Sequence, residues 1–221
     1  MRERCVTALE EGYRRVQLKV GTGVREDIER IEACMEALGA AELVIADANA
    51  WWTQAEAARV IAAVEHLDLL VEQPCATLEE CARLRSTTSR PFVLDESLTQ
   101  LDDLVKARAA GSVDGVRLKL SRFGGITPVR RARDLAASFG LPITVEDAGG
   151  GDLISAATAH LAASIPPRLL LAGYLPGEMT AERIATGTPE PSGGRARVPD
   201  GPGLGVEVTE DALGDHLLRV E

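Results

Sequence analysis

Short apolar runs alternate with longer amphipathic stretches along the whole chain. The apolar runs are nearly continuous, which is typical of strands that are buried on both faces of a sheet. They are RVQLKV (15–20), ELVIAD (42–47), DLLVE (68–72), PFVLD (91–95), DGVRLKL (114–120), LPITVED (141–147) and RLLLAGY (168–174). The stretches between them carry apolar residues at three- and four-residue spacing, with charged residues on the opposite face, as amphipathic helices do. The pattern therefore predicts seven parallel strands joined by helices.

Six of the apolar runs end in a charged residue, and these ends recur at a regular interval. The residues are Lys19, Asp47, Glu72, Asp95, Lys119 and Glu146, which are separated by 28, 25, 23, 24 and 27 residues. A period of about 25 residues is the length of one strand–loop–helix–loop unit, and internal periodicity of this kind indicates a repeated architecture.

Parallel strands joined by helices form either an open, doubly wound sheet or a closed (β/α)8 barrel. No Gly-x-Gly-x-x-Gly turn follows the first strand, which disfavours a dinucleotide-binding sheet. Charged residues at the strand ends favour the barrel, because the active site of a barrel lies at the carboxyl ends of its strands. We therefore predict an α/β fold, a TIM barrel of the (β/α)7β type.

The predicted barrel is one strand short of eight. Residues 2–12 have the pattern of a helix, so the first strand found is 15–20 and the first strand of the barrel is expected to be missing. We assign residues 1–172 to the barrel units. Residues 173–221 are expected to form an irregular C-terminal tail that packs back on the barrel.

The composition and net charge of the chain disfavour some classes of binding partner. The net charge of −10 argues against a nucleic-acid partner, which needs a basic surface, and is compatible with cationic ligands. No apolar run approaches the roughly 18 residues of a membrane span, and the charged amino terminus does not have the pattern of a signal peptide. We therefore predict a cytoplasmic protein with no membrane role. The four cysteines lack zinc-site spacing, so we expect reduced thiols.

Asp47, Glu72 and Asp95 end three consecutive strands at the same rim of the predicted barrel. Neighbouring strands lie about 4.8 Å apart, so the three carboxylates are expected to converge and to raise one another's pKa values. A hard divalent cation would relieve this repulsion, and Mg²⁺ suits carboxylate ligands. The alternative is that the acids cap helices or pair with arginines. We predict metal binding because all three occupy matching positions.

Lys19 precedes the three acids and Lys119 follows them, each on its own strand. Burial and a nearby divalent cation would both lower the pKa of a lysine at the barrel mouth towards that of a general base. Two such lysines, on opposite sides of a bound carboxylate, would remove and return a proton at its α-carbon. The alternative is that both lysines only extend from the strand ends into solvent.

The order of these motifs resembles the enolase superfamily, in particular its mandelate racemase and muconate lactonizing enzyme branch. The motifs are QLKVG (17–21), ADAN (46–49), EQPC (72–75), LDES (94–97), LKLSRFGG (118–125), VEDAGGGD (145–152) and PDGPGLGVEV (199–208). QLKVG and EQPC are most similar to the group of proline-betaine epimerases and cis-3-hydroxyproline dehydratases. The resemblance implies a capped TIM barrel that acts on small carboxylates.

Residue by residue, the resemblance implies the following roles. Asp47, Glu72 and Asp95 would be the Mg²⁺ ligands, and Lys19 and Lys119 the two acid/base catalysts. Gln17, Asn49, Trp52, Glu146 and Asp147 are assigned to substrate binding. Gln17 stands where relatives often have lysine, and would donate a hydrogen bond to a substrate carboxylate without adding charge.

Two departures from the family pattern bear on the substrate. Relatives in this group usually carry tryptophan at the position of Gly149, where its ring would offer a cation–π surface to an ammonium group. Trp51 or Trp52 would compensate, unless they pack in the core or at the rim. We also expect the family's amino-terminal capping domain, of more than a hundred residues, to be missing from this chain.

The sequence therefore supports two hypotheses of different classes. The first is an enzyme that abstracts the α-proton of a small, amino-acid- or proline-like carboxylate, giving racemization, epimerization or dehydration through an enolate. The second is a barrel fragment that binds metal but is inactive, or half of a split enzyme whose cap is a separate chain. Family resemblance also suggests a homo-oligomer.

Overall fold

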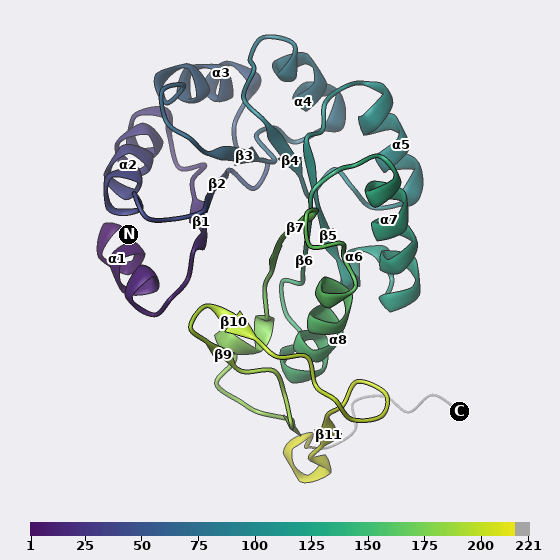
Figure 1. Cartoon of the computed structure of the whole chain (residues 1–221). Coiled ribbons are helices and arrows are strands. Elements are labelled where there is room, and N and C mark those ends of the chain that lie inside the picture. Colours follow the sequence, from purple (N-terminus) through teal and green to yellow (C-terminus); the bar gives the residue numbers. More distant parts are fainter. Residues whose placement is uncertain (215–221) are drawn as a thin grey trace.

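A curved sheet of seven parallel strands forms the centre of the molecule, as expected for an α/β barrel. The computed structural model describes residues 1–214 and is shown in Figure 1. The strands follow their sequence order and are β1 (Arg15–Lys19), β2 (Leu43–Asp47), β3 (Leu70–Glu72), β4 (Phe92–Leu94), β5 (Gly115–Lys119), β6 (Ile143–Glu146) and β7 (Leu170–Gly173). The seven strands and their parallel arrangement confirm the predicted fold class.

Helices surround the outer face of the curved sheet. They are α1 (Arg2–Glu10), α2 (Val24–Ala37), α3 (Gln54–Ala63), α4 (Leu78–Arg85), α5 (Leu101–Ala109), α6 (Leu120–Phe123), α7 (Ile126–Ser138) and α8 (Gly151–Ala163). Helices α3 and α4 begin with capping boxes, in which Thr53 pairs with Glu56 and Thr77 pairs with Glu80. These side chains satisfy backbone N–H groups that the first helical turn leaves free.

The register of the sheet aligns the charged strand ends. Lys19 is the partner of Asp47, which is in turn the partner of Glu72. Further along the sheet, Lys119 on β5 is the partner of Glu146 on β6. The polar ends of the strands therefore share one rim.

Strands β1 and β7 are the two edges of the sheet. Residues of β1 and β7 are mostly half-buried or exposed, whereas those of β4 are all buried. The curvature brings the edges close enough for Arg15 on β1 to donate to the backbone carbonyls of Leu170 and Leu171 at 2.7 and 2.5 Å. One side chain thus joins the two edges.

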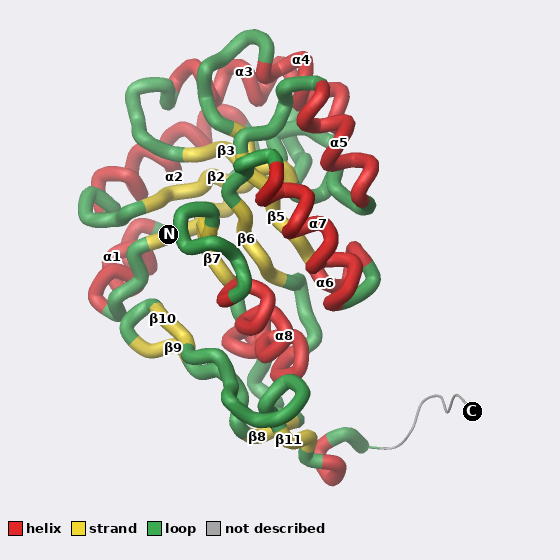
Figure 2. The backbone as a smooth tube through the Cα atoms, turned by 45° about the vertical axis from the view of Figure 1, so that its right-hand side comes forward, coloured by secondary structure: helices red, strands yellow, loops and turns green. Residues whose placement is uncertain are grey.

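The segment after β7 has little regular structure (Figure 2). It contains the short helices η1 (Pro176–Met179) and η2 (Glu210–Ala212), and the two-residue strands β8 (Ala185–Thr186), β9 (Pro191–Ser192), β10 (Arg195–Ala196) and β11 (Glu207–Val208). Positions 215–221 of the predicted tail lie outside the described residues.

Hydrogen bonds attach this segment to α8. Asp152 accepts from the backbone N–H of Ile184 at 2.7 Å, and His160 contacts the carbonyl of Leu204 at 3.1 Å. At the other edge, a Cβ atom on Gly12 would lie 2.7 Å from the backbone of Gly193, so this approach requires glycine. Within residues 1–214, no helix is both long and apolar enough to cross a membrane.

Candidate active site

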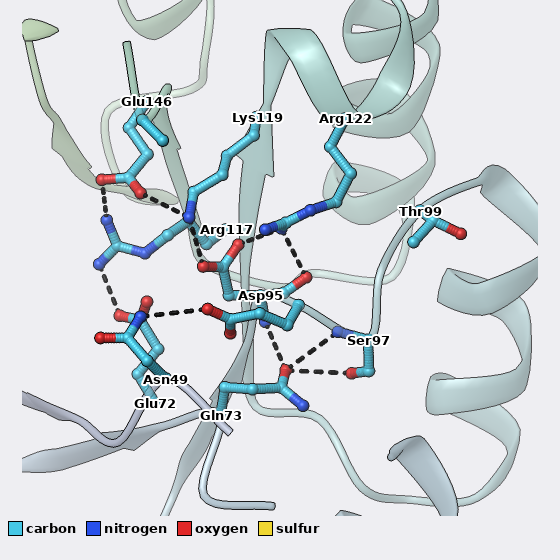
Figure 3. A network of polar contacts seen from close by, with 12 residues as sticks. Asn49, Glu72, Gln73, Asp95, Ser97, Thr99, Arg117, Lys119, Arg122 and Glu146 are labelled. Atoms are coloured by element: carbon cyan, nitrogen blue, oxygen red, sulfur yellow. Dashed lines mark hydrogen bonds and ion pairs between the residues drawn. The ribbon is translucent and has the colours of Figure 1, made fainter. Parts of the chain in front are cut away.

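Three buried carboxylates end or follow consecutive strands at the rim of the sheet. Asp47 ends β2, Glu72 ends β3 and Asp95 follows β4, with exposed fractions of 1%, 0% and 0%. Figure 3 shows Glu72 and Asp95 within a network of cationic and amide side chains. The structure therefore brings the predicted acids to the same rim, each with partners from other strands.

Strand β1 and the loop after β2 supply the partners of Asp47. The Lys19 ammonium lies 2.5 Å from Asp47 Oδ2 and donates to Asn49 Oδ1 at 3.1 Å. The Gln17 amide donates to Asp47 Oδ2 at 2.9 Å and to Glu72 Oε2 at 3.1 Å. Gln17 thus links two of the acids. Asn49, at a φ of 46°, also donates to Glu96 at 3.1 Å.

Strand β5 and helix α6 supply the partners of Asp95. The Lys119 ammonium lies 2.7 Å from Asp95 Oδ2 and 3.2 Å from Glu146 Oε1. Arg122 pairs with Asp95 Oδ1 and donates to the Asp95 carbonyl at 2.9 Å. Burial lowers the pKa of Lys119, but Asp95 and Glu146 favour its charged form, and the net direction is upward. The neighbouring carboxylates thus favour the protonated form of Lys119, and the lowered pKa expected beside a bound cation stays a prediction.

Arg117 lies beneath this group, and the sequence argument missed it. Its guanidinium donates to Glu72 Oε2 at 2.6 Å and pairs with Glu146, and its exposed fraction is 0%. The ring of Tyr174, just after β7, lies 5.1 Å from the guanidinium carbon. One sequence feature could have identified Arg117: side chains alternate between the two faces of a strand, so Arg117 lies on the same face of β5 as Lys119.

Gln73 fixes the ends of β3 and β4 to each other, and the sequence argument also missed it. Its side-chain oxygen accepts from the backbone N–H of Asp95 at 2.9 Å and from the Ser97 hydroxyl at 3.1 Å, while its amide donates to the carbonyl of Cys75 at 2.8 Å. Gln73 is fully buried and has a φ of 34°, which is uncommon for a residue other than glycine.

Two buried carboxylate oxygens in this region, Glu72 Oε1 and Glu96 Oε2, accept no hydrogen bond from the described residues. The pKa of Glu72 is raised to about 8: burial is the largest cause and Asp47 and Asp95 act in the same direction, while Arg117 acts against them. An unpaired, buried oxygen beside two other carboxylates is suited to a hard cation. Among residues 1–214, however, no three acidic, histidine or cysteine side chains converge on a common point as they stand. The acids are instead turned towards lysine, arginine and glutamine.

The structure does not bring two of the predicted substrate-binding residues into this group. Trp52 is 4% exposed, and its indole N–H donates to Asp27 Oδ2 at 2.9 Å, so its ring packs in the core. Asp147 accepts from the backbone N–H and the hydroxyl of Ser121 at 2.6 and 2.7 Å. Trp51, by contrast, is 74% exposed.

Comparisons with known proteins agree on the family. Residues 1–212 match the family described as "Enolase C-terminal domain-like". The chain is 43% identical over 209 residues to a cis-3-hydroxy-L-proline dehydratase from Roseibium aggregatum, covering 95% of this chain and 57% of that protein. It is 30% identical over 222 residues to an N-succinyl-L-Arg/Lys racemase from Bacillus cereus, covering 96% and 58% of the two chains. The chain thus spans a little over half the length of these relatives.

A solved structure gives the same result for the fold. A member of the enolase superfamily from Roseovarius nubinhibens, complexed with magnesium, superposes with a TM-score of 0.93 at 36% identity. The match covers 98% of this chain and 59% of that one. The relatives described above are named as a dehydratase and a racemase. The chain belongs to the enolase C-terminal domain-like family.

Proposed function

We propose that this chain forms the barrel of an enzyme that abstracts the α-proton of a small, amino-acid- or proline-like carboxylate with the help of Mg²⁺. The observation that carries this proposal is the placement of two lysines on either side of three buried carboxylates. Lys19 pairs with Asp47, and Lys119 pairs with Asp95, while Glu72 lies on the strand between them. Relatives named as a dehydratase and a racemase support this class of reaction.

Asp47, Glu72 and Asp95 are the residues that would hold the metal ion. When bound, the ion would supply positive charge beside the substrate carboxylate and so favour loss of the α-proton. Lys19 and Lys119 now pair with Asp47 and Asp95, and they would have to leave these carboxylates to contact the substrate. Gln17 and Asn49, which already contact this group, are available to orient it.

The two lysines carry the protons in this proposal. A neutral amine on one lysine accepts the α-proton, and the electron pair of the C–H bond moves into the carboxylate to give an enolate. For racemization or epimerization, the ammonium of the other lysine donates a proton to the opposite face of the α-carbon. For dehydration, an ammonium protonates the departing β-hydroxyl, which leaves as water. Both outcomes share the first step.

Solvent exchange tests the proposal. The chain is incubated with Mg²⁺ in D₂O with proline, cis-3-hydroxyproline and N-succinyl amino acids. Deuterium at the α-carbon without loss of water supports racemization or epimerization, and a 2-keto or unsaturated product supports dehydration. Lys119→Met should abolish either signal, whereas Lys106→Met, on the exposed face of α5, should retain it. If neither signal appears with any of these acids, the proposal is contradicted for this chain alone.

A second candidate is a metal-binding barrel that needs another chain for activity. It is favoured by the half-buried to exposed edge strands β1 and β7. Exposed strand edges pair readily with additional strands. The partner would be a separate capping chain or a second copy, and activity that appears only on adding a capping segment would support this candidate.

A further inference from the structure

Arg117 links four strands in the interior of the sheet. It extends from β5, donates to Glu72 on β3 at 2.6 Å, pairs with Glu146 on β6, and lies 5.1 Å from the ring of Tyr174 after β7. The side chains of Arg117 and Glu72 both have exposed fractions of 0%. A guanidinium is planar and offers several donors in a fixed fork, so two carboxylates can hold it in one orientation.

The hydrogen bonds of the three rim carboxylates are distributed unequally. Both oxygens of Asp47 and both oxygens of Asp95 have partners. Glu72 differs, because Arg117 and Gln17 both donate to Oε2 and the described residues leave the buried Oε1 without a hydrogen bond. Glu72 is therefore held by one oxygen only.

We propose that Arg117 is a positioning residue, which fixes Glu72 through Oε2 and so keeps Oε1 free and oriented as a single-oxygen ligand for the divalent cation. This inference rests on the metal site of the proposed function and adds a residue to it. Glu146 pairs with the other arm of the guanidinium and Tyr174 lies against it, so both restrict its rotation. Partners that orient a ligand in this way commonly change metal affinity by about 10- to 100-fold when they are removed.

The charge of Arg117 and its proposed positioning of Glu72 predict opposite changes in metal affinity when Arg117 is replaced. A cation beside a metal site repels the metal, so charge alone predicts that Arg117→Met binds a divalent ion more tightly. Positioning predicts weaker binding, because Glu72 is free to turn. Arg117→Lys retains the charge but replaces the planar fork by a point donor, so only positioning predicts a loss of affinity for that variant.

The test is a titration with Mn²⁺, followed by the electron paramagnetic resonance signal of the free ion, on the 221-residue chain. Arg117→Lys and Arg117→Met are each expected to bind at least about tenfold more weakly than the native chain. Arg90→Lys is the matched control, since Arg90 is also buried but donates to the carbonyls of Val64 and Leu69 away from the site. It should bind Mn²⁺ like the native chain.

Cooperative unfolding in urea establishes that each variant is folded. Equal or tighter Mn²⁺ binding by Arg117→Lys would overturn the role of Arg117 while leaving the metal site intact. A native chain that leaves the Mn²⁺ signal unchanged would overturn the metal site, and this inference with it. If neither Arg117 variant unfolds cooperatively, Glu146→Gln decides. This variant removes the ion pair between Glu146 and the Arg117 guanidinium. Weaker Mn²⁺ binding would then support the inference, and unchanged binding would overturn it.

Discussion

The two lysines assigned to the same chemistry lie in different surroundings. The side chain of Lys19 is 57% exposed and, among the acids of residues 1–214, pairs with Asp47 alone, whereas that of Lys119 is 11% exposed and lies between Asp95 and Glu146. Lys19 extends from β1, an edge strand, and Lys119 from β5, which has a neighbour on each side. The position of a strand in the sheet, rather than the residue type, therefore sets how strongly water screens each ion pair.

Replacing the two lysines tests this difference directly. Lys119→Met leaves Asp95 with Arg122 alone and removes one cation from Glu146. Breaking a buried ion pair from one side typically costs 3–5 kcal/mol, so we expect the free energy of unfolding to fall by about 3 kcal/mol. Lys19→Met should cost less than about 1 kcal/mol, because its pair is partly exposed and Asp47 keeps its other donors. Equal losses in urea unfolding would refute the comparison.

The two tryptophans extend the comparison to the loop after β2. Trp52→Phe removes the hydrogen bond to the buried carboxylate of Asp27, which also accepts from the backbone N–H groups of Gly21 and Gly23 at 2.9 and 3.1 Å. We expect a loss of about 2 kcal/mol, as for other hydrogen bonds to charged groups. Trp51→Phe, at the exposed neighbouring position, is the control and should change stability by less than about 0.5 kcal/mol. Urea unfolding followed by circular dichroism measures both.

Glu72 lies on the strand between those that carry Asp47 and Asp95, and its titration tests the same rim by a change of pH instead of a substitution. Burial raises its pKa from 4.5 to about 8, so the folded chain holds this proton more tightly than the unfolded chain does. The metal-free chain should therefore lose stability as pH rises from 4.5 to about 8. Mg²⁺ competes with the same proton, so its stabilising effect should be greater at pH 8 than at pH 6. Both trends should weaken in Glu72→Gln, as thermal unfolding with EDTA or Mg²⁺ would reveal.

The arrangement of the sheet was predictable because each strand is a short, continuous apolar run. The run at 42–47 became β2 at Leu43–Asp47, and the run at 15–20 became β1 at Arg15–Lys19. Once the strands are parallel and consecutive, their carboxyl ends must share a rim, so the grouping of the acids followed from topology.

The pairing of side chains was not predictable in the same way. Arg117 is hidden in an apolar run, and its partners Glu72 and Glu146 are 45 and 29 residues away in sequence. Trp51 is exposed and Trp52 is buried directly after Asn49 and Ala50, two residues with left-handed backbone that no apolar pattern predicts. Both results depend on local geometry and on contacts across strands, which hydrophobic periodicity does not encode.

The bridge made by Arg15 has a consequence for the order in which the molecule assembles. Its carbonyl acceptors at Leu170 and Leu171 are 155 and 156 residues away along the chain, whereas each strand–helix unit closes over a short loop. Contacts at such separation form only after the intervening chain is ordered, because the entropy of closing the loop must be overcome first. We therefore expect the local units to form first, and the contact between the two edges to act mainly by slowing their separation.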